Sequence, residues 1–321
     1  MLQNYTEKYL NNKYKIIDFM SLNFFAFFIS IVLVIISLTI ITFKGFYFGL
    51  EFTGGTVIEI SFSKLINLDK VRENLMFHGH KKILIQHFGS VHNIIIRLPP
   101  NQDFKDKTID KSIISIINRN IDNKAFLKRI EFVGPSVGDE LVKKGFIAIL
   151  SAFIGILIYI SIRFEWRLAS ATVITLIHDV IFILGILSLF QVEFNMTVLA
   201  ALMSVIGYSL NDSIVIFDRI RENFCKIHHV SSCLIINLSL TQTLKRTLIT
   251  SISTLLVVLM LYIFGGLMLK GFSLVFLIGV IIGSISSIYV ASSLVLMMGI
   301  KRKHLVPMIL LKEEDNENYL K

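Results

Sequence analysis

Polar and ionisable side chains recur at helical spacing inside one of the most apolar parts of the chain. Ser204, Tyr208 and Asp212 follow one another every four residues, with Asn211 beside them, so we expect them on one face of a helix. A carboxylate near the centre of a membrane span costs roughly 2.5 to 3.5 kcal/mol on insertion scales. A carboxylate that carries this cost is expected to have a function. The first hypothesis for such a residue is a proton or ion site, with a partner residue elsewhere in the helix bundle.

Three residues are candidate partners for Asp212. Arg246 opens the following apolar stretch, where it shares a helix face with Thr250, and a guanidinium can hold a carboxylate through two hydrogen bonds. His178 and Asp179 lie near the middle of an earlier stretch. Alternatives stay open for two of them. Arg246 can simply mark the cytoplasmic edge of its span, and Asp179 can be a second relay carboxylate or a structural hydrogen-bond acceptor.

Six apolar stretches must position these side chains, and each is long enough, at about 20 residues, to cross a bilayer. The chain is 54% hydrophobic, and charged residues make up only 17% of it. The predicted spans are 24–43, 146–162, 168–190, 195–217, 247–268 and 272–299. The first span is too long for the apolar core of a signal peptide, which favours an uncleaved signal anchor. The sequence therefore predicts a polytopic α-helical membrane protein.

Lysine and arginine gather at the ends of the apolar stretches on one side of the predicted membrane. They lie in the N-terminal segment 1–23, between the second and third spans, in the connection 218–246 and in the tail 300–321. The connections on the other side carry almost no positive charge. This placement of the net charge of +9 favours membrane orientation over nucleic-acid binding, and it predicts that both termini are cytoplasmic.

The segment 44–144 then lies outside the cytoplasm as a periplasmic domain large enough to fold alone. Its pattern predicts the order βαββαβ of an α+β ferredoxin-like domain. The expected elements are the strand 54–62, the helix 69–78, the strands 82–88 and 91–98, the helix 107–120 and the strand 126–132. Gly54 and Gly55 at its start, and Gly134 and Pro135 at its end, are candidate hinges.

Metal binding and catalysis are both disfavoured by the same residues. The histidines of the segment 44–144 lack cysteines or carboxylates at zinc-ligand spacing, so neither a metal site nor a cofactor is expected. A serine protease built on Ser209 and His178 would lack a recognisable oxyanion arrangement. An Asp179–Asp212 dyad would lack the glycine-flanked aspartate of aspartyl intramembrane proteases. The sequence therefore predicts a transport subunit rather than an enzyme.

Several motifs, in order along nearly the whole chain, resemble the SecF family of the bacterial protein-export machinery, within the RND superfamily. They are 48–55 (FGLEFTGG), 133–138 (VGPSVG), 207–212 (GYSLND), 217–223 (FDRIREN), 243–251 (TLKRTLITS) and 264–266 (FGG). One position departs from the family pattern, because Glu51 stands where the family usually has aspartate. The resemblance implies six transmembrane helices that form half of an RND-type bundle, completed by a SecD partner.

The resemblance also implies a role. Members of the family associate, with SecD, with the SecYEG channel and YajC in the cytoplasmic (inner) membrane. They use the proton-motive force to assist late translocation of preproteins, after the SecA motor has acted. The matching residues for proton passage are Asp212 and Arg246. The alternative is a passive scaffold that stabilises the Sec channel or assists membrane-protein insertion. A drug-exporting half-transporter would need a larger outer domain with an aromatic-lined pocket.

Overall fold

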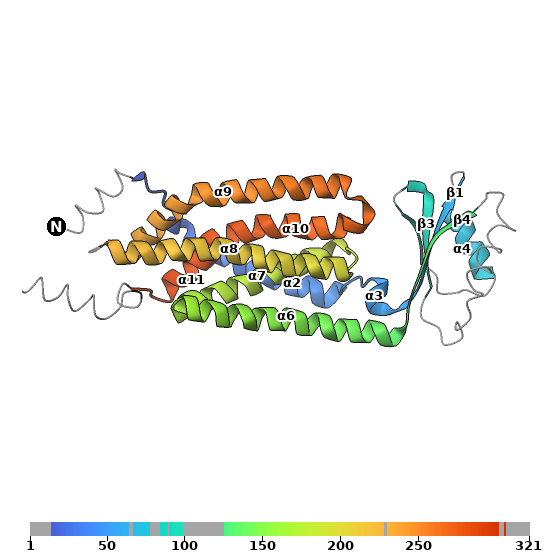
Figure 1. Cartoon of the computed structure of the whole chain (residues 1–321), viewed down its shortest axis with the longest axis horizontal. Helices are drawn as coiled ribbons and strands as arrows, with labels where there is room; N and C mark the ends of the chain where they lie inside the picture. The colour runs from blue at the N-terminus through green and yellow to red at the C-terminus, as the bar shows by residue number, and fades with distance from the viewer. Residues whose placement is uncertain are drawn as a thin grey trace, which may run out of the picture. The chain divides into compact units, whose positions relative to one another are not determined.

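A computed structural model describes residues 14–63, 67–77, 84–88, 90–98, 125–227, 230–301 and 305 (Figure 1). The chain divides into two compact units. The helical unit comprises 1–47, 149–192 and 197–321, and the sheet unit comprises 48–148 together with the short segment Glu193–Met196. The sheet unit therefore includes a piece of the connection between two membrane helices.

Among the described residues, six helical segments are long and apolar enough to span a bilayer, which confirms the predicted number of spans. The six segments are α2 (Asn23–Lys44), α6 (Pro135–Arg163), α7 (Trp166–Phe190), α8 (Met196–Lys226), α9 (Ser232–Phe264) and α10 (Gly266–Ser286). A short 3-10 turn, η1 (Met20–Leu22), precedes α2, and α10 continues through the π-helical turn η2 (Ser287–Ala291) into α11 (Ser292–Met297). A π-turn inserts one residue into a helix and is often found at functional sites.

Helices α8 and α9 run well beyond the predicted span ends into the segment 218–246. The apolar stripe of α8 continues there with Phe217, Ile220 and Phe224, which are all buried. These side chains pack in one core cluster with Ile235 and Ile236 of α9. The predicted connection is therefore a helical hairpin, since a continuous apolar face favours helix over loop wherever it can be buried.

Small residues bring α10 close to α8. A Cβ atom added at Gly279 would lie 2.3 Å from the side chain of Val205, and one added at Gly283 would lie 3.1 Å from the Cβ of Ser209. Both glycines belong to a four-residue repeat of small residues, which is the pattern by which membrane helices approach closely. This contact positions the polar residues between the two helices.

The sheet unit contains the short helix α3 (Leu50–Thr53), followed by β1 (Gly55–Phe62), α4 (Leu68–Phe77), β2 (Leu84–Phe88), β3 (Ser90–Leu98) and β4 (Ala125–Val133). The strand order is β2-β3-β1-β4, and each neighbouring pair is antiparallel. This order is that of a split βαβ fold, so the ferredoxin-like prediction is confirmed for these elements. The predicted helix 107–120 lies outside the described residues.

The core of the sheet unit follows the two periodicities of its elements. Alternate residues of β1 are buried, and they pack against alternate residues of β3 and against two residues of α4 that are four positions apart. The residues are Ile58, Ile60, Phe62, Ile94, Ile96, Leu98, Val71 and Leu75.

Of the predicted hinge residues, Gly55 lies in closely packed backbone. Gly55 has a φ of +124°, and a Cβ there would lie 2.4 Å from the carbonyl oxygen of Leu98. Gly54 ends α3 with a φ of +70°. Pro135 begins α6, where proline is favoured because no partner is needed for its nitrogen, and Gly134 precedes it. The glycine at 55 is thus needed for a close approach of two strands, and a hinge role stays a prediction.

Candidate functional site

Asp212 lies on α8 inside the bundle, with only 2% of its surface exposed. Ser284 of α10 donates a hydrogen bond to its Oδ2 over 3.4 Å. The hydroxyl of Ser284 lies 2.7 Å from that of Ser251 on α9, and Tyr208 donates to Ser251 over 3.2 Å. Four polar side chains from three helices therefore form one hydrogen-bonded chain that ends at the carboxylate.

Each hydroxyl in this chain can both accept and donate a hydrogen bond. If Ser251 donates to Ser284, every O–H from Tyr208 onward points toward Asp212. The last contact is long for an O–H···O bond, which is usually 2.5 to 3.0 Å. It is also the only side-chain hydrogen bond to Asp212 within the described residues. The carboxylate is thus buried and weakly held, whereas buried charges are normally paired.

Arg246 does not contact Asp212 in this structure. Its side chain on α9 is exposed, and among the described residues no ion pair joins the two. The two residues predicted for proton passage therefore do not make the two-bond contact that arginine can make with a carboxylate.

Asp179 is the second buried carboxylate, and it is firmly held. It is 1% exposed on α7, and its Oδ2 accepts hydrogen bonds from Ser209 of α8 and Ser286 of α10, each over 2.8 Å. His178 Nδ1 lies 3.0 Å from its Oδ1. A carboxylate that joins three helices through short hydrogen bonds has the geometry of a structural acceptor. This arrangement favours the second of the two roles left open for Asp179.

The other predicted polar residues do not join the network around Asp212. Ser204 and Asn211 are exposed, and Ser204 donates to the carbonyl of Ala200 on its own helix. Thr250 donates to backbone carbonyls of α9. The reason is helical geometry. Four residues advance an α-helix by one turn plus about 40°, so Ser204 is rotated by about 80° from Asp212. Of the predicted face, Tyr208 alone reaches the chain of hydroxyls.

Four serines of the two networks were not predicted as site residues. They are Ser209, Ser251, Ser284 and Ser286. The sequence held a signal for two of them, because Ser284 and Ser286 follow Gly283 by one and three residues, and α10 touches α8 at Gly283. Single serines beside a close helix contact are the groups best placed to serve a carboxylate on the facing helix.

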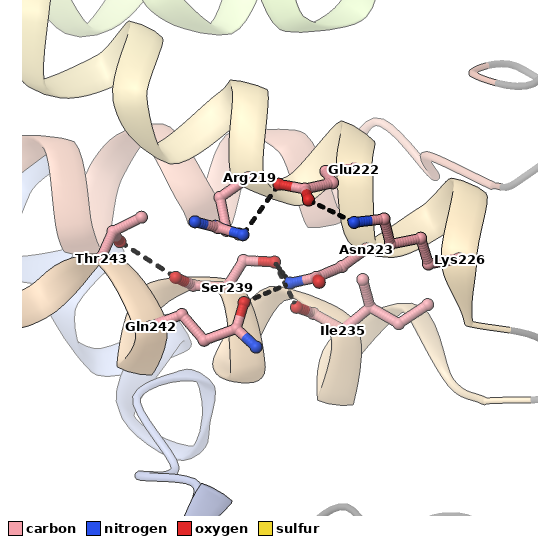
Figure 2. Close-up of polar contacts among 8 residues, drawn as sticks. All are labelled: Arg219, Glu222, Asn223, Lys226, Ile235, Ser239, Gln242 and Thr243. Atoms are coloured by element: carbon pink, nitrogen blue, oxygen red, sulfur yellow. Dashed lines mark hydrogen bonds and ion pairs between the residues drawn. The ribbon is translucent and has the colours of Figure 1, made fainter.

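Polar contacts in the helical hairpin 218–246, which is predicted to be cytoplasmic, fix the register of α8 against α9 (Figure 2). Buried Asn223 donates through Nδ2 to Ser239 Oγ over 2.8 Å and to Gln242 Oε1 over 3.0 Å. Arg219 and Lys226, on the same helix, both form ion pairs with Glu222. Because α8 and α9 are continuous helices, the hydrogen bonds of Asn223 also fix how Asp212 of α8 and Ser251 of α9 are aligned along the two helix axes.

Comparison with known proteins gives consistent results. The family model described as protein export membrane protein SecD/SecF, C-terminal, matches residues 113–301, and the SecD/SecF GG motif matches residues 39–64. The chain is 52% identical to the protein translocase subunit SecF of Escherichia coli O157:H7, over 98% of this chain and 97% of that protein. It is 47% identical to the SecF subunit of Vibrio alginolyticus, over 91% of this chain and 93% of that one.

Two solved structures are similar over most of the chain. A crystal structure of SecDF, a translocon-associated membrane protein from Thermus thermophilus, matches 88% of the chain with a TM-score of 0.79 and 33% identity. SecDF in a super-membrane-facing form matches 95% with a TM-score of 0.66 and 30% identity. The chain spans 38% and 40% of the length of these SecDF chains. Its family matches and near-full-length relatives show that the chain belongs to the SecF family of protein translocase subunits.

Proposed function

We propose that the chain is an auxiliary subunit of the Sec preprotein translocase that uses the proton-motive force to promote late translocation across the cytoplasmic membrane. It acts with a SecD partner, beside the SecYEG channel and YajC, and both of its termini are cytoplasmic. The membership of the SecF family supports the export role, and the similarity to SecDF chains supports the pairing with SecD.

One observation carries the coupling to protons. Asp212 is a nearly inaccessible carboxylate within the predicted span 195–217, and its contact with Ser284 is long. A carboxylate retained at this depth without strong pairing is a candidate proton carrier, because protonation removes the cost of its buried charge. The hydroxyl chain from Tyr208 supplies groups that can hand a proton to it.

The mechanism follows from the charges. An ionised Asp212 is attracted to Arg246, and this attraction favours one arrangement of α8 and α9. A proton on Asp212 removes the attraction, so the helices relax to a second arrangement until the proton leaves on the other side. One charge crossing about 100 mV supplies roughly 2.3 kcal/mol, which shifts a two-state population about 50-fold. The sheet unit follows the helices and biases emerging polypeptide outward.

Export of a secreted precursor in cells that lack their own SecF tests the proposal. The cells are complemented with the parent chain, with Asp212→Asn or with Asp218→Asn. The control makes the same chemical change on the same helix, at a half-exposed aspartate whose partner is Arg163. Each protein must accumulate equally in the membrane with SecD.

We expect Asp212→Asn to lose export that depends on the proton-motive force and Asp218→Asn to retain it. Asparagine keeps the size and hydrogen bonding of the site while removing its ability to bind and release a proton. Normal export by Asp212→Asn would contradict the proton-carrier role of Asp212 and would favour a passive scaffold as the function.

A further inference from the structure

Within the sheet unit, the segment 48–53 is bound to Glu193–Met196, the end of the connection between α7 and α8. Gly49 donates its backbone N–H to the carbonyl of Phe194 over 2.8 Å. The ring of Phe194 lies 6.0 Å from that of Phe48 and 5.6 Å from that of Phe52. We call these two segments, together with Arg97 of β3, the collar.

Two carboxylates of the collar make the contacts that matter for its position. Glu51 Oε2 accepts the backbone N–H of Met196, the first residue of α8, over 2.5 Å. The first N–H groups of a helix lack partners within the helix, and negative charge is favoured there. Arg97 Nη2 lies 2.5 Å from Glu193 Oε2. These side chains are 16% and 33% exposed, so water screens the pair less than it screens a surface ion pair.

Both carboxylate contacts lead directly into the sheet. Glu51 lies in α3, and β1 begins only four residues later, at Gly55. Arg97 lies in β3, where it is the register partner of Val57 in β1. The collar has little free space, because a Cβ at Gly49 would lie 3.0 to 3.2 Å from Glu193, Phe194 and Asn195. Close packing of this kind transmits displacement instead of absorbing it.

The other end of the connection is α8 itself, an unbroken helix of 31 residues from Met196 to Lys226. Asp212 follows Met196 by 16 residues along it, or about 24 Å at 1.5 Å per residue. A straight helix bound at its first residue carries a shift or rotation of its middle to that residue.

We propose that the collar is a rigid coupling that passes the movement of α8 to the sheet, and that Glu51 and Arg97 are its positioning residues. The inference rests on the proposed function, and it locates the joint through which proton binding becomes movement of the sheet unit. It also assigns a role to the glutamate that stands where the family usually has aspartate. The carboxylate reaches the N-terminus of α8 and need not touch a proton.

The simpler account is that the collar merely anchors a loop and maintains the fold. The two accounts differ in proton flux. A coupling that is broken lets Asp212 continue to load and release protons while export stops. A lost anchor that damages the fold reduces both.

The test measures export and proton entry side by side, in a Cys225→Ser/Cys233→Ser background assembled with SecD. The variants are Glu51→Ala, Arg97→Glu, Glu193→Arg and the exchange Arg97→Glu/Glu193→Arg. The control, Arg72→Glu, disrupts an exposed ion pair with Asp69 on α4 of the same unit.

We expect the three single variants to reduce export by about fivefold or more, the lower end of typical coupling effects, with proton entry retained. We expect the charge exchange to restore export and the control to match the parent. Normal export in the single variants, or parallel loss of export and proton entry, would overturn the coupling. A parent that shows no dependence on the proton-motive force would instead overturn the proposed function itself.

A double-cysteine variant asks whether the collar must stay closed. Cysteines at Gly49 and Asn195 would have Cβ atoms 3.1 Å apart, so a shift of a few tenths of an ångström brings them into the usual 3.5 to 4.5 Å of a disulfide. A rigid coupling predicts that the oxidised protein exports as well as the reduced one. Export that stops on oxidation and returns on reduction would show that the joint opens in each cycle, which contradicts a rigid coupling.

Discussion

Asp179 and Asp212 are both aspartates buried inside the bundle, yet their surroundings are opposite. Asp179 accepts two short hydrogen bonds from serines of two other helices and lies beside His178. Asp212 receives one long bond from Ser284. A fully satisfied buried polar group fixes the packing of its neighbours, whereas a poorly satisfied one costs stability and is retained for another reason. In our proposal, this difference separates a structural carboxylate from a proton-carrying one.

The largest expected difference is in thermal stability, between a variant that lacks the Asp179 carboxylate and one that lacks the Asp212 carboxylate. Asp179→Leu leaves Ser209 and His178 without their acceptor and Ser286 with only the carbonyl of Gly283, and each unsatisfied buried group costs about 1 to 3 kcal/mol. Asp212→Leu removes a poorly paired buried charge, and such replacements are often neutral or stabilising by about 1 to 4 kcal/mol. The measurement is the thermal unfolding midpoint of the purified protein with SecD. Equal midpoints for the two variants would remove the distinction.

Arg246 should be the next most sensitive position, in export rather than stability. It is exposed and makes no ion pair with Asp212 in this structure, so in the proposed mechanism it acts through its charge alone. We therefore expect Arg246→Gln to reduce proton-dependent export about tenfold, a change of about 1.4 kcal/mol, while Arg246→Lys stays near the parent. Export assays at matched protein levels check both. An Arg246→Lys protein as defective as Arg246→Gln would mean that the two-bond contact forms during the cycle.

Asn223 extends the comparison to the hairpin, where its amide nitrogen donates two hydrogen bonds (Figure 2). Asn223→Ala removes hydrogen bonds to Ser239 and Gln242, which should destabilise the protein by about 1 to 2 kcal/mol. Export for each molecule that remains folded should stay unchanged. Accumulation in the membrane, measured together with export, separates the two effects. Reduced export at normal stability would give the hairpin a part in the proton cycle.

Two serines two positions apart on α10 give the smallest and most specific contrast. Ser284→Ala removes the hydroxyl that contacts Asp212, and we expect export to fall about twofold, as for one weak hydrogen bond. Ser286→Ala removes a bond to Asp179 and should lower the unfolding midpoint while leaving export unchanged. The same two assays apply. An exchange of the two phenotypes would assign the roles of the carboxylates the other way round.

The sequence predicts the spans and the strands because their signals are local. Bilayer thickness sets the length of an apolar stretch, and alternation marks strands such as β1 with its buried Ile58 and Ile60. Asp212 is also identifiable, since a carboxylate is costly wherever it lies in a span.

The hydroxyl partners are not predictable in the same way. The serine that contacts Asp212 is determined by the axial position and the rotation of α10 relative to α8. The close contacts at Gly279 and Gly283 determine both. Ser204 and Asn211, predicted on the polar face of Asp212, are exposed, and within the described part of the chain neither is hydrogen-bonded to it. The reason is that eight residues rotate Ser204 by about 80° and one residue rotates Asn211 by about 100° from Asp212. The collar was not foreseen, since it joins residues nearly 150 positions apart.

Proton entry into sealed vesicles tests the central claim most directly. The chain and its SecD partner are reconstituted with a pH-sensitive dye inside, and an inward proton gradient is applied to the parent, Asp212→Asn and Asp218→Asn. The account predicts acidification with the parent and with Asp218→Asn, and only the background leak with Asp212→Asn. Acidification by Asp212→Asn at the rate of the parent would contradict a proton-carrying role for Asp212.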